Sequence, residues 1–174
     1  MKAILFLLVL LAASSSSFAQ RFAMKRDVIT VDGQPYLKFE SDGYTSLYIS
    51  SLQNERLLVV KEMELSDPAL RQTGSVNNAH FYLQYVFLKP HTIVETPRPP
   101  AFTSLPVMVA RTLYAARLLQ DDGVSQPALS EFSLVNGTVY SERRQALNQA
   151  GWLPPAAPGT PATSLPQSPH TPRP

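Results

Sequence analysis

The chain of 174 residues contains no cysteine and only seven glycines. Without cysteine there is no disulfide and no thiol nucleophile, so the core alone has to hold the fold together. None of the glycines stands in a phosphate-cradling or dinucleotide-binding pattern, which argues against the usual nucleotide loops. The many serines form no Gly-x-Ser-x-Gly motif, so the signature of that class of serine hydrolase is missing as well.

An excess of charge of one sign is also missing. Lys2 and Arg173 lie outside the span 20–152, which leaves thirteen basic and thirteen acidic residues within it. The basic patch that nucleic acids or anionic membranes require is therefore not expected. The segment 126–136 resembles the second helix of a helix-turn-helix, but its single charge, Glu131, is negative. We predict no nucleic-acid partner.

Residues 1–19 have the pattern of a secretory signal peptide. Lys2 gives a positive start, residues 3–13 form an apolar run, and Ser17-Phe18-Ala19 offers small residues before a cleavage site. The run is shorter than the roughly 20 residues that span a bilayer. We predict cleavage between Ala19 and Gln20, a secreted or periplasmic protein, and no integral membrane segment after cleavage. Export without cysteine points to a bacterial envelope or medium.

The other end of the chain is rich in proline. Residues 153–174 contain eight of the sixteen prolines. Such a segment lacks the backbone donors and apolar content of a sheet or core, so we predict a disordered, proline-rich tail. The tail is either a plain solvated end or a docking strip for a partner. The span 20–152 is then a single globular domain.

Two Asp-Gly pairs, Asp32-Gly33 and Asp42-Gly43, separate short runs of β-branched and aromatic residues. Tight hairpins need positive φ in their turns, which glycine adopts freely and aspartate tolerates. We therefore predict two successive hairpins that join strands near 28–31, 35–40 and 44–50. The aspartates serve the turns.

The register of the first hairpin stays open. A two-residue loop puts Val28 on the same face as Leu37 and Phe39, whereas a three-residue loop with a glycine bulge puts Ile29 there. In both cases Tyr36 and Lys38 share the other face.

The next segments continue the sheet. Residues 57–65 form an apolar and then alternating strand, a long loop covers 66–78, and 80–88 is the strongest strand signal because it is apolar on both faces. Such a strand is expected in the centre, covered by something other than solvent. Residues 92–95 form at most a short further strand.

Beyond residue 100 the apolar period changes to that of a helix. Residues 104–120 form one helix, with Ser104 as N-cap and Gly123 as C-cap. A second helix follows Ser125 and stops at Asn136-Gly137, and residues 141–150 form a short third helix with a weak apolar face.

The predicted fold is α+β: an antiparallel β-meander of four to five strands followed by two or three helices packing on one sheet face. The expected core combines Leu37, Phe39 and alternate members of Phe81, Leu83, Tyr85 and Phe87 with Leu113 of the first helix.

Two histidines of the domain, His80 and His91, raise the question of a metal site with Glu95, Asp121 or Asp122. Their spacing matches no helix-based or turn-based ligand pattern. We predict no metal and no cofactor.

Carboxylate pairs are the remaining catalytic candidates. Glu62 and Glu64 alternate with apolar residues, as on a solvated strand face. Asp121-Asp122 is interpreted as a turn between helices, although aspartate at a helix C-terminus opposes the helix dipole. Neither pair suffices to assign a catalytic residue.

Arg143 and Arg144 stand side by side next to Glu142 in the third helix. Adjacent arginines can grip an anionic ligand, but beside an acidic residue they more often form an exposed helix face. We favour the exposed face.

These observations favour an exported, non-enzymatic interaction or structural protein of the cell envelope. Its sheet surface or its tail would contact a protein or an envelope polymer. The alternatives are an extracytoplasmic hydrolase whose carboxylates we do not assign, and a carrier of a small apolar ligand held between sheet and helices. A cleft with convergent titratable groups would favour the hydrolase, and an apolar pocket the carrier.

Overall fold

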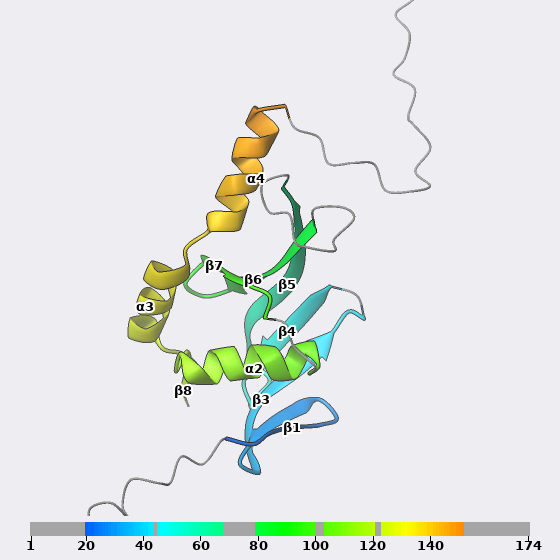
Figure 1. The fold of residues 1–174 in the computed structure, drawn as a ribbon. Helices are drawn as coiled ribbons and strands as arrows, with labels where there is room; N and C mark the ends of the chain where they lie inside the picture. The colour runs from blue at the N-terminus through cyan, green and yellow to red at the C-terminus, as the bar shows by residue number, and fades with distance from the viewer. Residues whose placement is uncertain (1–19, 44, 68–78, 100–102, 121–122, 152–174) are drawn as a thin grey trace, which may run out of the picture.

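The computed structural model describes residues 20–43, 45–67, 79–99, 103–120 and 123–151. Seven antiparallel strands form one sheet in chain order, and three helices follow them (Figure 1). The strands are β1 (Phe22–Lys25), β2 (Val28–Val31), β3 (Gln34–Ser41), β4 (Ser46–Ser50), β5 (Arg56–Ser66), β6 (Ala79–Phe87) and β7 (Thr92–Pro97). The helices are α2 (Leu105–Ala115), α3 (Gln126–Asn136) and α4 (Val139–Gln149).

The α+β class is confirmed, but the sheet has seven strands and not four to five. The strand β1 was missed because its turn to β2 carries no glycine: Arg26 takes the positive φ of 56° itself. A two-stranded sheet of β8 (Leu119–Gln120) and β9 (Gly123–Val124) lies between α2 and α3. The predicted leader 1–19, the tail from residue 153 and most of the loop 66–78 lie outside the described residues.

The two Asp-Gly pairs are turns, as predicted. Asp32 and Gly33 both have positive φ, 51° and 82°, and they connect paired residues Val31 and Gln34. The carboxylate of Asp32 accepts a hydrogen bond from the backbone N–H of Arg21 at 2.8 Å, which ties the turn to β1. The carboxylate of Asp42 accepts one from the N–H of Ser46.

A β-bulge decides the register of the first hairpin. Ile29 pairs with Leu37, but its neighbour Thr30 pairs with Pro35, so Tyr36 is the extra residue. The loop therefore has two residues, yet Ile29 and not Val28 shares a face with Leu37. The bulge also turns Tyr36 to the core side, where its ring meets Tyr114 of α2 edge-on at 5.3 Å. The prediction that Tyr36 lies with Lys38 was wrong.

A second bulge has the same effect in β5. Ile49 pairs with Leu58 while Ser50 pairs with Arg56, which leaves Leu57 as the extra residue. Leu57 and Leu58 are both buried in the larger of two apolar clusters, which we call the main core and which lies between the sheet and the helices α2 and α3. Bulges bend and twist a strand locally. Here each of them adds one large side chain to the face that the helices cover.

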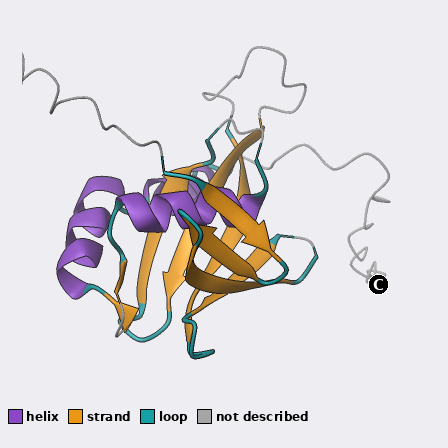
Figure 2. Cartoon of the chain, turned by 90° about the horizontal axis from the view of Figure 1, so that it is seen from below, coloured by secondary structure: helices purple, strands orange, loops and turns teal. Residues whose placement is uncertain are grey.

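The helices α2 and α3 cover one face of the sheet (Figure 2). Strand alternation assigns Leu83, Tyr85 and Phe87 to this face, and all three are fully buried. They pack with Leu37, Leu58 and Val94 against Val109 and Leu113 of α2 and Leu129 and Phe132 of α3. The predicted core is thus present, except that Phe81 lies beyond it and is 43% exposed. β6 has a neighbour on each side but is next to the edge of the sheet.

The helix predicted over 104–120 ends at Ala115. Arg117 takes a left-handed φ of 52°, its N–H bonds to the carbonyl of Tyr114, and the N–H of Leu118 bonds to the carbonyl of Leu113. This is a Schellman motif with arginine where glycine is usual. Gly123 belongs to β9 and caps no helix, and Asp121 and Asp122 lie outside the described residues.

The third helix does not join the other two. The chain leaves α3, passes the edge of β7 where the N–H of Glu95 bonds to the carbonyl of Gly137, and enters α4 (Figure 1). Leu147 of α4 packs on Leu65 and Tyr82, which point to the opposite face of the sheet from Leu83 and Tyr85. The three helices are therefore divided between both faces, with α2 and α3 on one and α4 on the other.

Candidate functional site

Those residues considered as metal ligands that the structure describes do not converge. His80 is at the start of β6, and His91 follows that strand in a turn with φ of 50°, so about 30 Å of extended chain separates them. Within the described ranges no three His, Asp or Glu side chains come together as a metal site would require. Glu62 forms an ion pair with Arg98 at 3.0 Å, and Glu64 is exposed.

Glu95 is one of two acidic residues in the described part of the chain that are only 1% exposed. One carboxylate oxygen accepts hydrogen bonds from the backbone N–H groups of Tyr140 and Ser141 at 3.0 and 2.9 Å. The other accepts from the side-chain amide of Gln84 at 3.0 Å and from the hydroxyl of Ser141. The carboxylate thus occupies the positive N-terminal end of α4 and satisfies its free donors.

A second buried carboxylate holds the middle of the same helix. Asp67 directly follows β5 and is 1% exposed. Its two carboxylate oxygens accept hydrogen bonds from Nε and Nη2 of Arg143. The Nε atom of Arg143 lies 2.5 Å from one carboxylate oxygen, and Nη2 lies 3.1 Å from the other. This fork geometry raises the pKa of Arg143, first through the hydrogen bonds and then through the charge of Asp67.

The other arginine binds the sheet as well. Nη2 of Arg144 donates to the Tyr82 hydroxyl at 2.6 Å and to the carbonyl of Glu64 at 3.0 Å. The ring of Tyr82 stacks on Tyr140 with centroids 4.5 Å apart, and His80 stacks on the same ring at 5.4 Å. Burial raises the pKa of Tyr82, so its hydroxyl remains a neutral partner at physiological pH. Arg143 is exposed, as predicted, and Arg144 is half-buried, but both side chains bind the sheet.

We call the sheet side of this contact the α4 seat: Leu65, Asp67, Tyr82, Gln84 and Glu95. Its two buried carboxylates have the burial that catalytic acids often show. Each of them is bound by donors of α4. The seat therefore fits a site that binds a helix better than one that transforms a substrate.

The same sheet face carries a strip beside the seat that the described residues leave partly exposed. Tyr48 pairs with Val59, Val59 with Val86, and Val86 with Ile93, so the four side chains form one row across β4 to β7. We call it the open row. Ile93 is 45% exposed and the other three are half-buried. The guanidinium of Arg56 lies 4.4 Å above the Tyr48 ring at one end.

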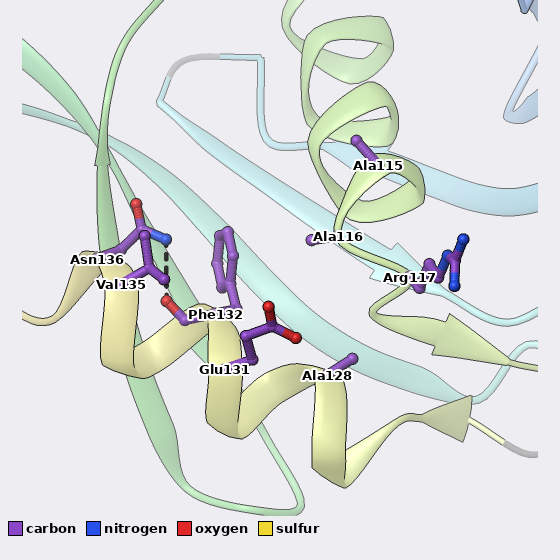
Figure 3. Close-up of a pocket in the computed structure, with 8 residues that line it drawn as sticks. All are labelled: Ala115, Ala116, Arg117, Ala128, Glu131, Phe132, Val135 and Asn136. Carbon is purple, nitrogen blue, oxygen red and sulfur yellow. Dashed lines mark hydrogen bonds between the residues drawn. The ribbon is translucent and has the colours of Figure 1, made fainter.

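A cleft of about 450 Å³ separates the end of α2 from α3 (Figure 3). Small side chains, Ala115, Ala116 and Ala128, form its walls, and Phe132 lines its inner side. Arg117 and Glu131 give its rim one charge of each sign. The space between α2 and the sheet, where an apolar carrier would hold its ligand, is filled by fully buried side chains such as Leu113 and Tyr85.

The fold and these surfaces define an antiparallel meander that keeps two helices on one face and binds a third by polar contacts on the other. Comparison of the chain with family models, with curated proteins and with solved structures finds no match. Among the described helices, none combines the length and the apolar character needed to cross a bilayer.

Sequence reasoning named Glu95, His80 and the two arginines but not their arrangement. Glu95 and Ser141 are 46 residues apart, and Arg143 and Asp67 are 76 apart. Asp67 and Tyr82 were not singled out for this role at all. A signal for Glu95 was present, since it is the acid of an otherwise apolar stretch, Ile93-Val94-Glu95.

Proposed function

We propose that this protein is an exported, non-enzymatic contact protein of a bacterial cell envelope, and that it binds another protein through the open row. The observation that carries the proposal is the row itself: four apolar or aromatic side chains aligned across four strands without cover from α4. Aromatic, aliphatic and arginine side chains are typical of the core of protein interfaces. Tyr48, Ile93 and Arg56 supply all three kinds.

Two further observations support a non-enzymatic role. The buried carboxylates Asp67 and Glu95 accept hydrogen bonds from α4, and among the described residues no three His, Asp or Glu side chains gather elsewhere. A hydrolase built on paired carboxylates needs two that reach the same substrate bond. The alternative of a hydrolase therefore receives no support from the geometry of the described part of the chain.

The contact surface is tested by affinity capture from native envelope extracts. Ile93→Ser should abolish the capture of specific partners because it removes the most exposed apolar side chain of the row. Leu134→Ser is the matched control, since Leu134 is 88% exposed but lies on α3. Both variants should keep the melting temperature of the parent protein. An unchanged set of partners with Ile93→Ser, or an equal loss with Leu134→Ser, would contradict the assignment.

The export half of the proposal has a separate test. The mature protein, isolated from cells that produce the full chain, should begin at Gln20 in intact-mass measurements. A protein that keeps Met1 and stays in the cytoplasm would refute export, whatever the open row binds.

A further inference from the structure

We propose that α4 can be exchanged between two copies of this chain, so that the α4 of one copy binds the α4 seat of the other in a domain-swapped dimer. Such an exchange needs an element with a self-contained contact surface, a short hinge, and a gain from opening the hinge. The region from α3 to α4 has all three.

The contact surface of α4 is separate from the main core. Its buried side chain Leu147 packs in a small cluster with Leu65 and Tyr82. The remaining contacts are the hydrogen bonds and stacked rings of the α4 seat described above. A second copy of α4 presents the same groups to the seat, so the exchanged contact is chemically identical to the closed one.

The hinge consists of two residues, Gly137 and Thr138, between α3 and α4. Gly137 has φ of 61° and ψ of −148°, a region that is open to glycine and strained for other residues. An added Cβ at this position would meet nothing within 4 Å, so only the backbone conformation demands glycine. Replacing the two-residue turn by helix would join α3 and α4 into one helix over 126–149.

Exposed apolar side chains surround this hinge. Leu134 is 88% exposed, Val135 76% and Val139 54%. Isolated exposed aliphatic residues are common, but three of them within six residues of the chain offer apolar surface that a partner can cover. In the opened dimer two such helices run past each other at the hinge. Val135 and Val139 are then spaced i, i+4 on one face, and they can pack against the same residues of the other copy.

The hinge is tested with Gly137→Ala after incubation at high protein concentration. Alanine disfavours the closed turn and favours the straight helix. We expect about a tenfold gain for each hinge, and so roughly a hundredfold lower dimer dissociation constant. Gly43→Ala is the matched control, because Gly43 also has positive φ, 83°, and open space around its Cα. Light scattering after size exclusion should show dimer for Gly137→Ala and monomer for Gly43→Ala.

A pair of charge reversals identifies the exchanged element directly. Asp67→Arg places two cations at the seat of a closed chain, and Arg143→Asp places two anions there. In a swapped heterodimer of the two variants, one seat regains the native pair and the other holds the reversed pair. The variants, one of them isotopically labelled, are refolded together and separately, and the products are measured by native mass spectrometry.

The proposal predicts that a heterodimer forms when the two variants are refolded together. Native mass spectrometry can detect it even if neither variant is stable alone. It is overturned if the mixture yields no heterodimer. It is also overturned if Gly137→Ala is no more dimeric than Gly43→Ala. Val135→Ser should weaken the dimer of Gly137→Ala, and an unchanged dissociation constant would exclude the face of Val135 and Val139 as part of its interface.

Discussion

Glu95 gives the sharpest test of how α4 is held, because alanine and glutamine remove different parts of its role. Glu95→Ala leaves the N–H groups of Tyr140 and Ser141 without their acceptor. A donor left unsatisfied costs about 1–3 kcal/mol, so for the two donors we expect a total loss of about 2–6 kcal/mol. The loss should fall on the attachment of α4, since the main core does not include this carboxylate.

Glu95→Gln should cost much less. The amide oxygen can still accept from the two helix N–H groups, while its NH₂ group can face Gln84 after that side chain rotates its amide, and the Ser141 hydroxyl can turn to accept. What is lost is the negative charge at the helix N-terminus, worth about 0.3–1 kcal/mol. A larger loss of stability in Glu95→Ala than in Glu95→Gln therefore shows that the hydrogen bonds of residue 95, as well as its negative charge, hold α4.

Hydrogen exchange resolves where the loss occurs. In Glu95→Ala the protection of α4 amides should fall by at least about thirtyfold, and in Glu95→Gln by about fivefold or less. Amides of β5 and β6 within the main core should keep their protection. Glu40→Ala is the control: this glutamate is 73% exposed, it pairs with Arg56 at 3.2 Å, and such surface pairs contribute little. Equal effects of alanine and glutamine, or equal losses in sheet and helix, would refute this account of α4.

Three further outcomes are expected. Leu113→Ala should lower the free energy of unfolding by about 2–5 kcal/mol in urea titrations, because Leu113 is fully buried, whereas the exposed Leu134→Ala should change it by less than about 0.5. Burial raises the pKa of Tyr85, so the folded state favours its neutral form. The protein should therefore lose stability as the pH rises above about 10, the pKa of an unfolded tyrosine. In alkaline unfolding curves, Tyr85→Phe should reduce that loss. Deletion of residues 153–174 should leave the melting temperature almost unchanged, and a large drop in calorimetry would show that the tail braces the domain.

The sequence predicted correctly the helix ends and turns that are set by nearby capping and glycine residues. The helix α3 runs over Gln126–Asn136, as Ser125 before it and Gly137 after it indicated. The Asp-Gly turns were predictable for the same reason, since positive φ selects glycine. Where another residue adopts positive φ, as Arg26 and Arg117 do, the sequence carried no such mark, so β1 and the end of α2 were missed.

The bulges at Tyr36 and Leu57 could not be predicted from alternation, because a bulge interrupts the alternation on which the prediction rests. Their cause lies in the packing they permit. Tyr36 meets Tyr114, and Leu57 joins the main core beside Leu58. Tyr114 belongs to α2, and Leu57 lies next to Gly123 of β9, so both contacts depend on parts of the chain that follow the sheet.

The position of α4 depends on two features that lie far apart in the sequence: the uncapped start of the helix and the buried acid Glu95. Thr138 makes no side-chain cap to α4, so the first N–H groups of the helix need another acceptor. Glu95 is buried on β7, where the sheet supplies its carboxylate with one side-chain donor, Gln84. A helix end that lacks an acceptor and a buried acid that needs more donors satisfy each other. The weak apolar face of residues 141–150 indicated a loosely held helix, because amphipathicity measures only apolar attachment. Here the attachment is carried by Glu95, Asp67 and the arginines, so a helix with one buried leucine still has a defined place on the sheet.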